Sequence, residues 1–149
     1  MALSKHLEIS QINDLIYLGS FEHLFDSNEE FTKLNIDVII NCAKEIVHTE
    51  ETKDKFIVEN FPFEDDNHAT LLEYIDEIND KIHDFLSSNK KIYIHGAYGI
   101  SRAPAILIYY LMSYKQFSYD EAFALIKAIR PIIDINDNFE RELRAIEEY

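Results

Sequence analysis

The stretch Lys91–Leu111 reads KIYIHGAYGISRAPAILIYYL and combines three local patterns. The apolar run KIYI is typical of a short buried strand, and HGAYGISRA, with two glycines, is typical of a tight turn. APAILIYYLMSY is apolar nearly all round and has Pro104 in its first turn, where a missing N–H costs little. The stretch therefore predicts a strand, a turn and a buried helix in succession.

The turn has the features of an anion site. Consecutive backbone N–H groups at the start of a helix favour negative charge, and the fork of Arg102 can hold two phosphate oxygens at once. His95 and Gly99 stand at spacings that suit this arrangement, but Gly96 has no side chain. A buried turn whose arginine pairs with a carboxylate is the alternative interpretation.

Strands and helices alternate along the rest of the chain. Apolar runs predict strands within DLIYLGS, closed by Gly19, within IDVIIN, and within KFIVENFPF, ending near Pro62. Helices are predicted at four further places: from a capping box at Ser27–Glu30 to about Leu34, over residues 69–88 with a capping box of Thr70 and Glu73, over 118–129 with one of Ser118 and Glu121, and from Asp137 to the end. This order favours one α/β sandwich over residues 1–149, with a mostly parallel sheet whose ligands bind beyond the carboxyl ends of its strands.

The composition of the chain limits the kinds of partner that it can bind. The 149 residues include 14 Lys plus Arg against 28 Asp plus Glu, a net charge of −14, which disfavours nucleic acid and anionic membranes and favours a partner with positive charge around the bound group. An apolar run of membrane-spanning length and a signal-peptide core are both missing, so a cytoplasmic or nuclear location is expected. The lone Cys42 argues against an intrachain disulfide and a cysteine-rich metal site, and we expect it to be buried. Neither a metal nor a cofactor is expected.

The turn resembles the signature H-C-x-x-G-x-x-R-[ST] of the cysteine-dependent dual-specificity phosphatases. His95, Gly99 and Arg102 match it, Gly96 stands at the cysteine position, and Ala103 at the Ser/Thr position. Further segments resemble the family in order: IYLGS, IDVIINCAKE, SRAPAILIYYLM, and RPIIDINDNFERELRAIEEY with Ile135 for a proline and Glu142 for a glutamine. The glycine at the nucleophile position also resembles the STYX type of pseudophosphatase.

The resemblance implies a protein tyrosine phosphatase-like sandwich with its phosphate-binding loop between a central strand and a buried helix. The implied loop residues are Gly96, Ala97, Tyr98, Gly99, Ile100, Ser101 and Arg102, supported by His95 and Ala103. The family's general acid is an Asp before the long helix. Asp65 and Asp66 both suit that role, and an ungapped count from Tyr74 favours Asp65.

The function expected from these residues is binding without catalysis. The family reaction needs a thiolate that attacks phosphorus, and Gly96 offers no such atom, while Ser101 and Tyr98 have no evident neighbouring base. We therefore expect a pseudophosphatase that holds phosphorylated Ser, Thr or Tyr of a phosphoprotein or phosphopeptide. The neutral loop positions make a lipid headgroup a poorer ligand.

Three alternatives stay open at this point. One is an active dual-specificity phosphatase whose nucleophilic cysteine at position 96 has been replaced by glycine. Another is a scaffold with a vestigial phosphate pocket. The third, an RNA 5′-phosphatase of the same superfamily, is opposed by the net charge of −14.

Overall fold

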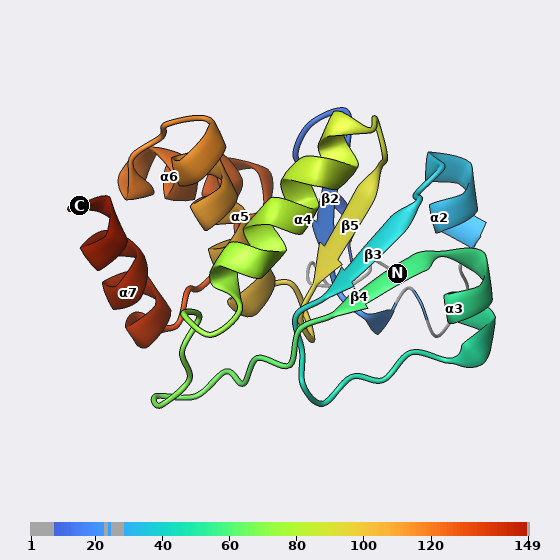
Figure 1. The fold of residues 1–149 in the computed structure, drawn as a ribbon, viewed down its shortest axis with the longest axis horizontal. Coiled ribbons are helices and arrows are strands. Elements are labelled where there is room, and N and C mark those ends of the chain that lie inside the picture. The colour runs from blue at the N-terminus through green and yellow to red at the C-terminus, as the bar shows by residue number, and fades with distance from the viewer. Residues whose placement is uncertain (1–7, 23, 25–28, 149) are drawn as a thin grey trace.

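The computed structural model describes residues 8–22, 24 and 29–148. Within them one sheet has the strand order β1-β2-β5-β3-β4, and Figure 1 shows β2, β5, β3 and β4 side by side. Its strands are β1 (Ser10–Gln11), β2 (Ile16–Gly19), β3 (Val38–Asn41), β4 (Ile57–Asn60) and β5 (Ile92–His95). Only β1 runs antiparallel to its neighbour, so the predicted mostly parallel sheet is confirmed.

Helices flank the sheet. Successive side chains of each strand point to opposite faces of the sheet, so the core has two layers, one on each face. The helices of the described residues are α2 (Glu29–Leu34), α3 (Glu50–Lys55), α4 (Ile75–Ser87), α5 (Arg102–Tyr114), α6 (Tyr119–Ile129) and α7 (Asp137–Glu147). One face of the strands packs in the main core with α4, α5, α6 and α7, and the other packs with α2 and Phe56 through Tyr17, Ile39 and Tyr93. The predicted α/β sandwich is therefore the observed fold.

The helix boundaries test the predicted caps. The capping box of Ser118 and Glu121 on α6 is confirmed, with both reciprocal hydrogen bonds present. The box predicted at Ser27–Glu30 falls partly outside the described residues, which resume at Glu29. β1 and α3 were not predicted, because two and six residues are too short to show a period.

The capping box predicted at Thr70 and Glu73 is wrong. A turn occupies residues 71–74, and α4 begins at Ile75 with Tyr74 as its N-cap. A carboxylate from another helix explains the difference: Glu142 of α7 accepts hydrogen bonds from the Thr70 hydroxyl and from the Leu71 N–H, at 2.9 Å for the latter. A tertiary contact thus takes the place of the local cap.

The central helix α5 is buried along most of its length, as its apolar sequence predicts. In the described part of the chain, no helix is both long enough and apolar enough to cross a membrane.

Candidate phosphate-binding loop

The loop of residues 96–101 lies at the carboxyl edge of the parallel strands. It joins β5, which lies between β2 and β3, to the N-terminus of α5. His95, the last residue of β5, pairs in register with Gly19 of β2 and Asn41 of β3. The sheet therefore holds the start of the loop from both sides.

Every carbonyl oxygen of the loop has a partner elsewhere in the protein. The Gly96 carbonyl accepts from His95 Nδ1 (2.6 Å), and the Ala97 carbonyl accepts from Phe21 N (3.0 Å) and Ser20 Oγ (3.2 Å). Arg130 donates to the Tyr98 carbonyl through Nη2 (2.7 Å) and to the Gly99 carbonyl through Nε (2.9 Å). The Ile100 carbonyl accepts from Asp134 N (2.9 Å), and the Ser101 carbonyl accepts from Ala105 N (3.0 Å). All described peptide bonds are trans, and a trans peptide points its N–H opposite to its C=O. The N–H groups of residues 97–102 are therefore directed away from these partners.

Arg130 ties this loop to the N-terminal edge of the sheet. It is 2% exposed, and its guanidinium donates to the carbonyls of Tyr98, Gly99 and Glu8 and to Ser10 Oγ. Burial lowers its pKa. The sequence places Arg130 in a family-like segment but gives no sign that its side chain holds the loop, because the contact spans more than thirty residues.

The two glycines of the loop differ in what the backbone requires. Gly99 has φ of +69°, and a Cβ there would lie 2.6 Å from the Gly19 carbonyl oxygen. At Gly96 a Cβ would meet only ordinary contacts, the nearest being 3.5 Å to Arg102 atoms. The fold therefore demands glycine at position 99 but has space for a side chain at position 96.

Arg102 forms a two-pronged ion pair with Glu45. Its Nη1 and Nη2 each lie 2.7 Å from a Glu45 carboxylate oxygen, and Nη1 also donates to the Phe63 carbonyl at 3.0 Å. The Arg102 side chain is 6% exposed, while that of Glu45 is 55% exposed. The hydrogen bonds from Arg102 hold the pKa of Glu45 below its usual value. The pairing of this arginine with a carboxylate, the alternative interpretation of the turn, is observed.

Sequence reasoning missed Glu45, although a signal was present. The residue follows β3 by four positions, and β3 lies beside β5, so both strand ends meet at one edge of the sheet. A carboxylate so close to the end of a neighbouring strand could have been proposed as a partner of Arg102.

The two candidate acids lie close to this ion pair. A hollow of about 500 Å³ is bounded by Lys44, Glu45, Glu64, Asp65, Asp66 and Arg102. The Asn136 side-chain amide holds both candidates, through the Asp65 carboxylate (3.3 Å) and the Asp66 carbonyl (2.8 Å). Burial acts to lower the pKa of Arg102, but the hydrogen bonds and charge of Glu45, with a smaller contribution from Asp65, raise it. Asp65 therefore acts electrostatically on Arg102.

A pair of buried histidines supports the first carbonyl of the loop. His95 Nε2 lies 2.8 Å from His48 Nε2, and His95 Nδ1 lies 2.6 Å from the Gly96 oxygen. Burial lowers the pKa of His95 to about 3 and also lowers that of His48. A neutral His95 must then donate from Nδ1 to the carbonyl and accept at Nε2 from His48. No sequence pattern indicated His48.

The remaining predicted residues lie as follows. Ala103 is fully buried at the start of α5, and Ser101 Oγ accepts from the Asn136 N–H at 2.9 Å. Tyr98 is 44% exposed, and its ring lies 6.0 Å from that of Phe21. It therefore packs on the protein's own surface.

Cys42 is buried, as predicted, and lies beside the nucleophile position. It follows Asn41, the register partner of His95, and its N–H donates to the His95 carbonyl at 2.7 Å. Burial raises the pKa of its thiol to about 12, against a smaller lowering effect of Arg102. The thiol is therefore protonated at neutral pH.

Comparison with known proteins places this geometry in a family. Residues 16–149 match the family model described as dual specificity phosphatase, catalytic domain. The human dual specificity protein phosphatase 14 is 31% identical over 140 residues, which cover 91% of this chain and 67% of that protein. Bovine dual specificity protein phosphatase 18 is 29% identical, covering 91% of this chain and 70% of that protein.

Solved structures agree on the fold. The human tyrosine phosphatase-like serine/threonine/tyrosine-interacting protein superposes with a TM-score of 0.85 at 24% identity, covering 95% of this chain and 97% of that one. A leucine rich repeat and phosphatase domain containing protein from Entamoeba histolytica gives 0.81 at 25% identity, over 96% of this chain and 92% of that one. The chain belongs to the dual-specificity phosphatase family.

Proposed function

We propose that this chain is a catalytically inactive dual-specificity phosphatase domain that holds a phosphorylated Ser, Thr or Tyr side chain of a protein without hydrolysing it. The observation that carries the proposal is a loop in which the carbonyls of residues 96–101 all bond to other groups and residue 96 has no side chain. The N–H groups of the same peptides point away from these bonds and, together with the N-terminus of α5, suit an anion. Gly96 supplies no atom to attack phosphorus.

Neighbouring groups are poor substitutes for the missing nucleophile. The Cys42 thiol is fully buried and protonated, since burial raises its pKa to about 12. Ser101 is 5% exposed, and its oxygen is engaged with Asn136. Tyr98 packs toward Phe21. The absent thiolate also removes a repulsion with phosphate, on the order of 4 kcal/mol for like charges about 4 Å apart near a protein surface.

Binding in the loop requires Arg102 to exchange partners. Glu45 is more than half exposed, so its carboxylate can turn into water when a phosphate arrives. A phosphate monoester carries about −1.5 to −2 charges and three acceptor oxygens, against one charge for a carboxylate. Phosphate is therefore expected to replace Glu45 on the fork of Arg102. The apparent affinity for phosphate equals its intrinsic affinity multiplied by the fraction of molecules in which Glu45 has left Arg102.

The charges around the hollow select the partner. Four carboxylates face Lys44 and Arg102 there, in a chain of net charge −14. An unmodified acidic peptide would be repelled, whereas lysine or arginine beside the phosphorylated residue would be attracted to the rim. The proposed ligand is accordingly a phosphopeptide with basic flanking residues.

A second candidate function is a scaffold whose phosphate pocket stays closed. The pairing of Arg102 with Glu45 and the acidic surroundings favour it, because both oppose an incoming anion. In this case partners would bind through other surfaces of the domain.

Isothermal titration separates the two functions. A phosphotyrosine peptide flanked by arginines is titrated into the protein, with the unphosphorylated peptide as control. We expect a dissociation constant on the order of 10–100 μM, at least about tenfold weakening in Arg102→Ala, and no phosphate release over hours. Because Arg102 is buried, thermal unfolding of the variant is recorded, and competition by inorganic phosphate on the unmodified protein gives a second measure.

Three results would contradict the proposal. Phosphate release by the unmodified protein would refute inactivity. Equal affinity for the phosphorylated and unphosphorylated peptides would refute phosphate recognition. An absence of binding in both the unmodified protein and Glu45→Gln would favour the closed scaffold.

A further inference from the structure

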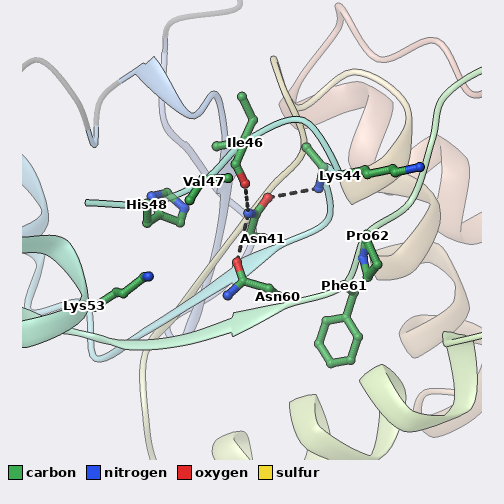
Figure 2. A pocket seen from close by; sticks show the side chains of 10 residues that line it. Asn41, Lys44, Ile46, Val47, His48, Lys53, Asn60, Phe61 and Pro62 are labelled. Atoms are coloured by element: carbon green, nitrogen blue, oxygen red, sulfur yellow. Dashed lines mark hydrogen bonds between the residues drawn. The ribbon is translucent and has the colours of Figure 1, made fainter. Parts of the chain in front are cut away.

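A second hollow, of about 210 Å³, lies at the carboxyl ends of β3 and β4 (Figure 2). We name it the β3–β4 pocket. Its lining residues are Asn41, Ala43, Lys44, Ile46, Val47, His48, Lys53, Asn60, Phe61 and Pro62. Open α/β sheets bind ligands beyond the carboxyl ends of their parallel strands, and this pocket has that location. The phosphate loop follows β5 and is a separate feature.

The charge of the β3–β4 pocket is opposite to that of the chain. Its described lining holds two lysines and a histidine and includes no carboxylate, whereas the hollow at Arg102 holds four carboxylates and two cations. In a chain of net charge −14, a pocket lined only by positive and neutral groups is a local exception. An organic anion therefore finds a more favourable field here than in the hollow at Arg102.

Lys53 is the cation that can serve a ligand. Lys44 binds Glu64 at 2.9 Å, and Figure 2 shows its side chain directed away from His48 and Asn60. Lys53 points toward them. Its pairing with Glu50 is long, at 3.5 Å, and the Glu50 side chain is 86% exposed. Such a pair is weak, so a ligand carboxylate can replace Glu50 at little cost.

His48 and Asn60 add polar groups beside Lys53. His48 is only 4% exposed, and burial together with the charge of Lys53 lowers its pKa. Because His48 donates its Nε2–H to His95, its Nδ1 carries a lone pair, so the charge of the anion is matched by Lys53 and not by His48. Asn60 accepts from the Asn41 amide through Oδ1 at 3.0 Å, which leaves its Nδ2 as a donor.

The size and the apolar wall define the ligand further. Ile46 and Val47 give the β3–β4 pocket an apolar side near His48, whereas the ring of Phe61 is directed away into the main core toward Tyr74 (Figure 2). A cavity of about 150 Å³ accommodates benzene, so a pocket somewhat larger suits about six to ten non-hydrogen atoms. Lysine acts as a point charge, and the described lining contains no arginine fork for the several oxygens of a phosphate. A single negative charge on an apolar body fits best.

We propose that the β3–β4 pocket binds a small organic carboxylate, with the carboxylate beside Lys53 and the Asn60 amide and the apolar part against Ile46 and Val47. Two hydrogen bonds connect the β3–β4 pocket to the phosphate loop. His48 is bonded to His95, and His95 to the Gly96 carbonyl. A ligand beside His48 is therefore expected to shift the backbone signal of the Gly96–Ala97 peptide.

Titration with benzoate, followed by two-dimensional NMR, tests the proposal, and benzamide is the neutral control of the same shape. We expect saturable shifts at His48, Lys53 and Asn60 with a dissociation constant on the order of 1 mM, and none with benzamide. Lys53→Gln should weaken benzoate at least about fivefold. Lys55→Gln, on the same helix and paired with Glu51, makes the same charge change outside the pocket and should have little effect.

Any of the following results would refute a carboxylate site in the β3–β4 pocket. Equal weakening by the two lysine variants would indicate general attraction, and shifts that do not saturate would indicate no site. Tighter binding of inorganic phosphate, or of a capped glutamate peptide, would replace a small carboxylate with another ligand. Benzoate binding should persist in Arg102→Ala, so that failure of the phosphate loop and failure of the β3–β4 pocket are separately visible.

Discussion

The guanidinium of Arg102 is held by the carboxylate of Glu45 through two parallel bonds of 2.7 Å. Glu45 thereby occupies the same donor fork that would hold two oxygens of a phosphate. Because the arginine is buried and the glutamate is more than half exposed, the carboxylate is the partner that can leave. The Glu45 carboxylate and a phosphate ligand would therefore compete for the same guanidinium.

Glu45→Gln is expected to strengthen phosphopeptide binding. The amide is a weaker partner for Arg102, and one negative charge leaves the hollow, so affinity should rise about five- to tenfold, or roughly 1–1.4 kcal/mol. Isothermal titration measures the change. Glu64→Gln removes a charge from the same hollow without touching Arg102 and should give less than half of this gain in free energy. Equal gains from both variants would show that only the overall field matters.

Gly96→Cys is expected to introduce phosphatase activity. A Cβ at position 96 meets no contact shorter than 3.5 Å, so the backbone of the loop can accept a side chain there without moving. Hydrolysis of p-nitrophenyl phosphate should rise at least about tenfold over the unmodified protein, and Ala103→Ser should increase it further. The assay needs a reductant, because Cys42 lies next to position 96 in the sheet register.

Asp65 can be tested as the general acid in that background. Asp65→Asn should lower the turnover of Gly96→Cys by about 10²-fold, whereas Asp66→Asn should leave most of it. Asp65 is expected to be the acid because the ungapped count from Tyr74 places it at the family's acid position. If Asp66→Asn lowered the turnover more than Asp65→Asn, Asp66 would be the general acid. Inactivity of both Gly96→Cys and its Ala103→Ser double variant would show that the loop is not competent.

Gly99→Ala is expected to destabilise the fold, unlike Gly96→Ala. Alanine at 99 must adopt φ of +69° with its Cβ 2.6 Å from the Gly19 carbonyl oxygen. The expected loss is about 2–4 kcal/mol, which lowers the melting temperature by roughly 4–12 °C. Gly96→Ala is a matched control that should change the melting temperature by less than about 3 °C. Thermal unfolding followed by circular dichroism measures both, and similar shifts would refute the packing described.

Stability should fall as the pH decreases from 7.5 to 5.5. Burial lowers the pKa of His95 to about 3, so in the unfolded chain it takes up a proton near pH 6.5 while in the folded protein it stays neutral. The unfolded state then binds more protons, and the free energy of unfolding drops by about 1.4 kcal/mol for this residue over that range. His48, whose pKa is also lowered, acts in the same direction.

Urea unfolding at the two pH values measures this loss. His95→Gln removes the titrating group and should reduce the difference between the two pH values, whatever its effect on absolute stability. Glu45 has its pKa lowered and loses its contribution only below its ordinary pKa near 4.5, so it does not contribute to this window. A free energy of unfolding that is unchanged or larger at pH 5.5 would refute the buried neutral histidine.

Local patterns in the sequence determined the main elements of this protein. Apolar runs specify β3 and β5 because both faces of a central parallel strand are buried, and the all-round apolar character of α5 specifies a central helix. The cap of α6 was predictable because Ser118 and Glu121 bond only to each other's backbone within four residues. The missing nucleophile at Gly96 and the general-acid candidates are also properties of the sequence, once its resemblance to the phosphatase signature is seen.

Tertiary structure alone decided which distant groups meet. Thr70 bonds to Glu142 and so does not cap α4, and Arg130 holds loop carbonyls more than thirty residues away. Glu45 reaches Arg102 only because β3 and β5 end side by side. The sequence carries no period that encodes such contacts, since they depend on how parallel strands are ordered. The sequence therefore predicts a phosphatase-like loop without a nucleophile, and the order of the strands pairs its arginine with Glu45.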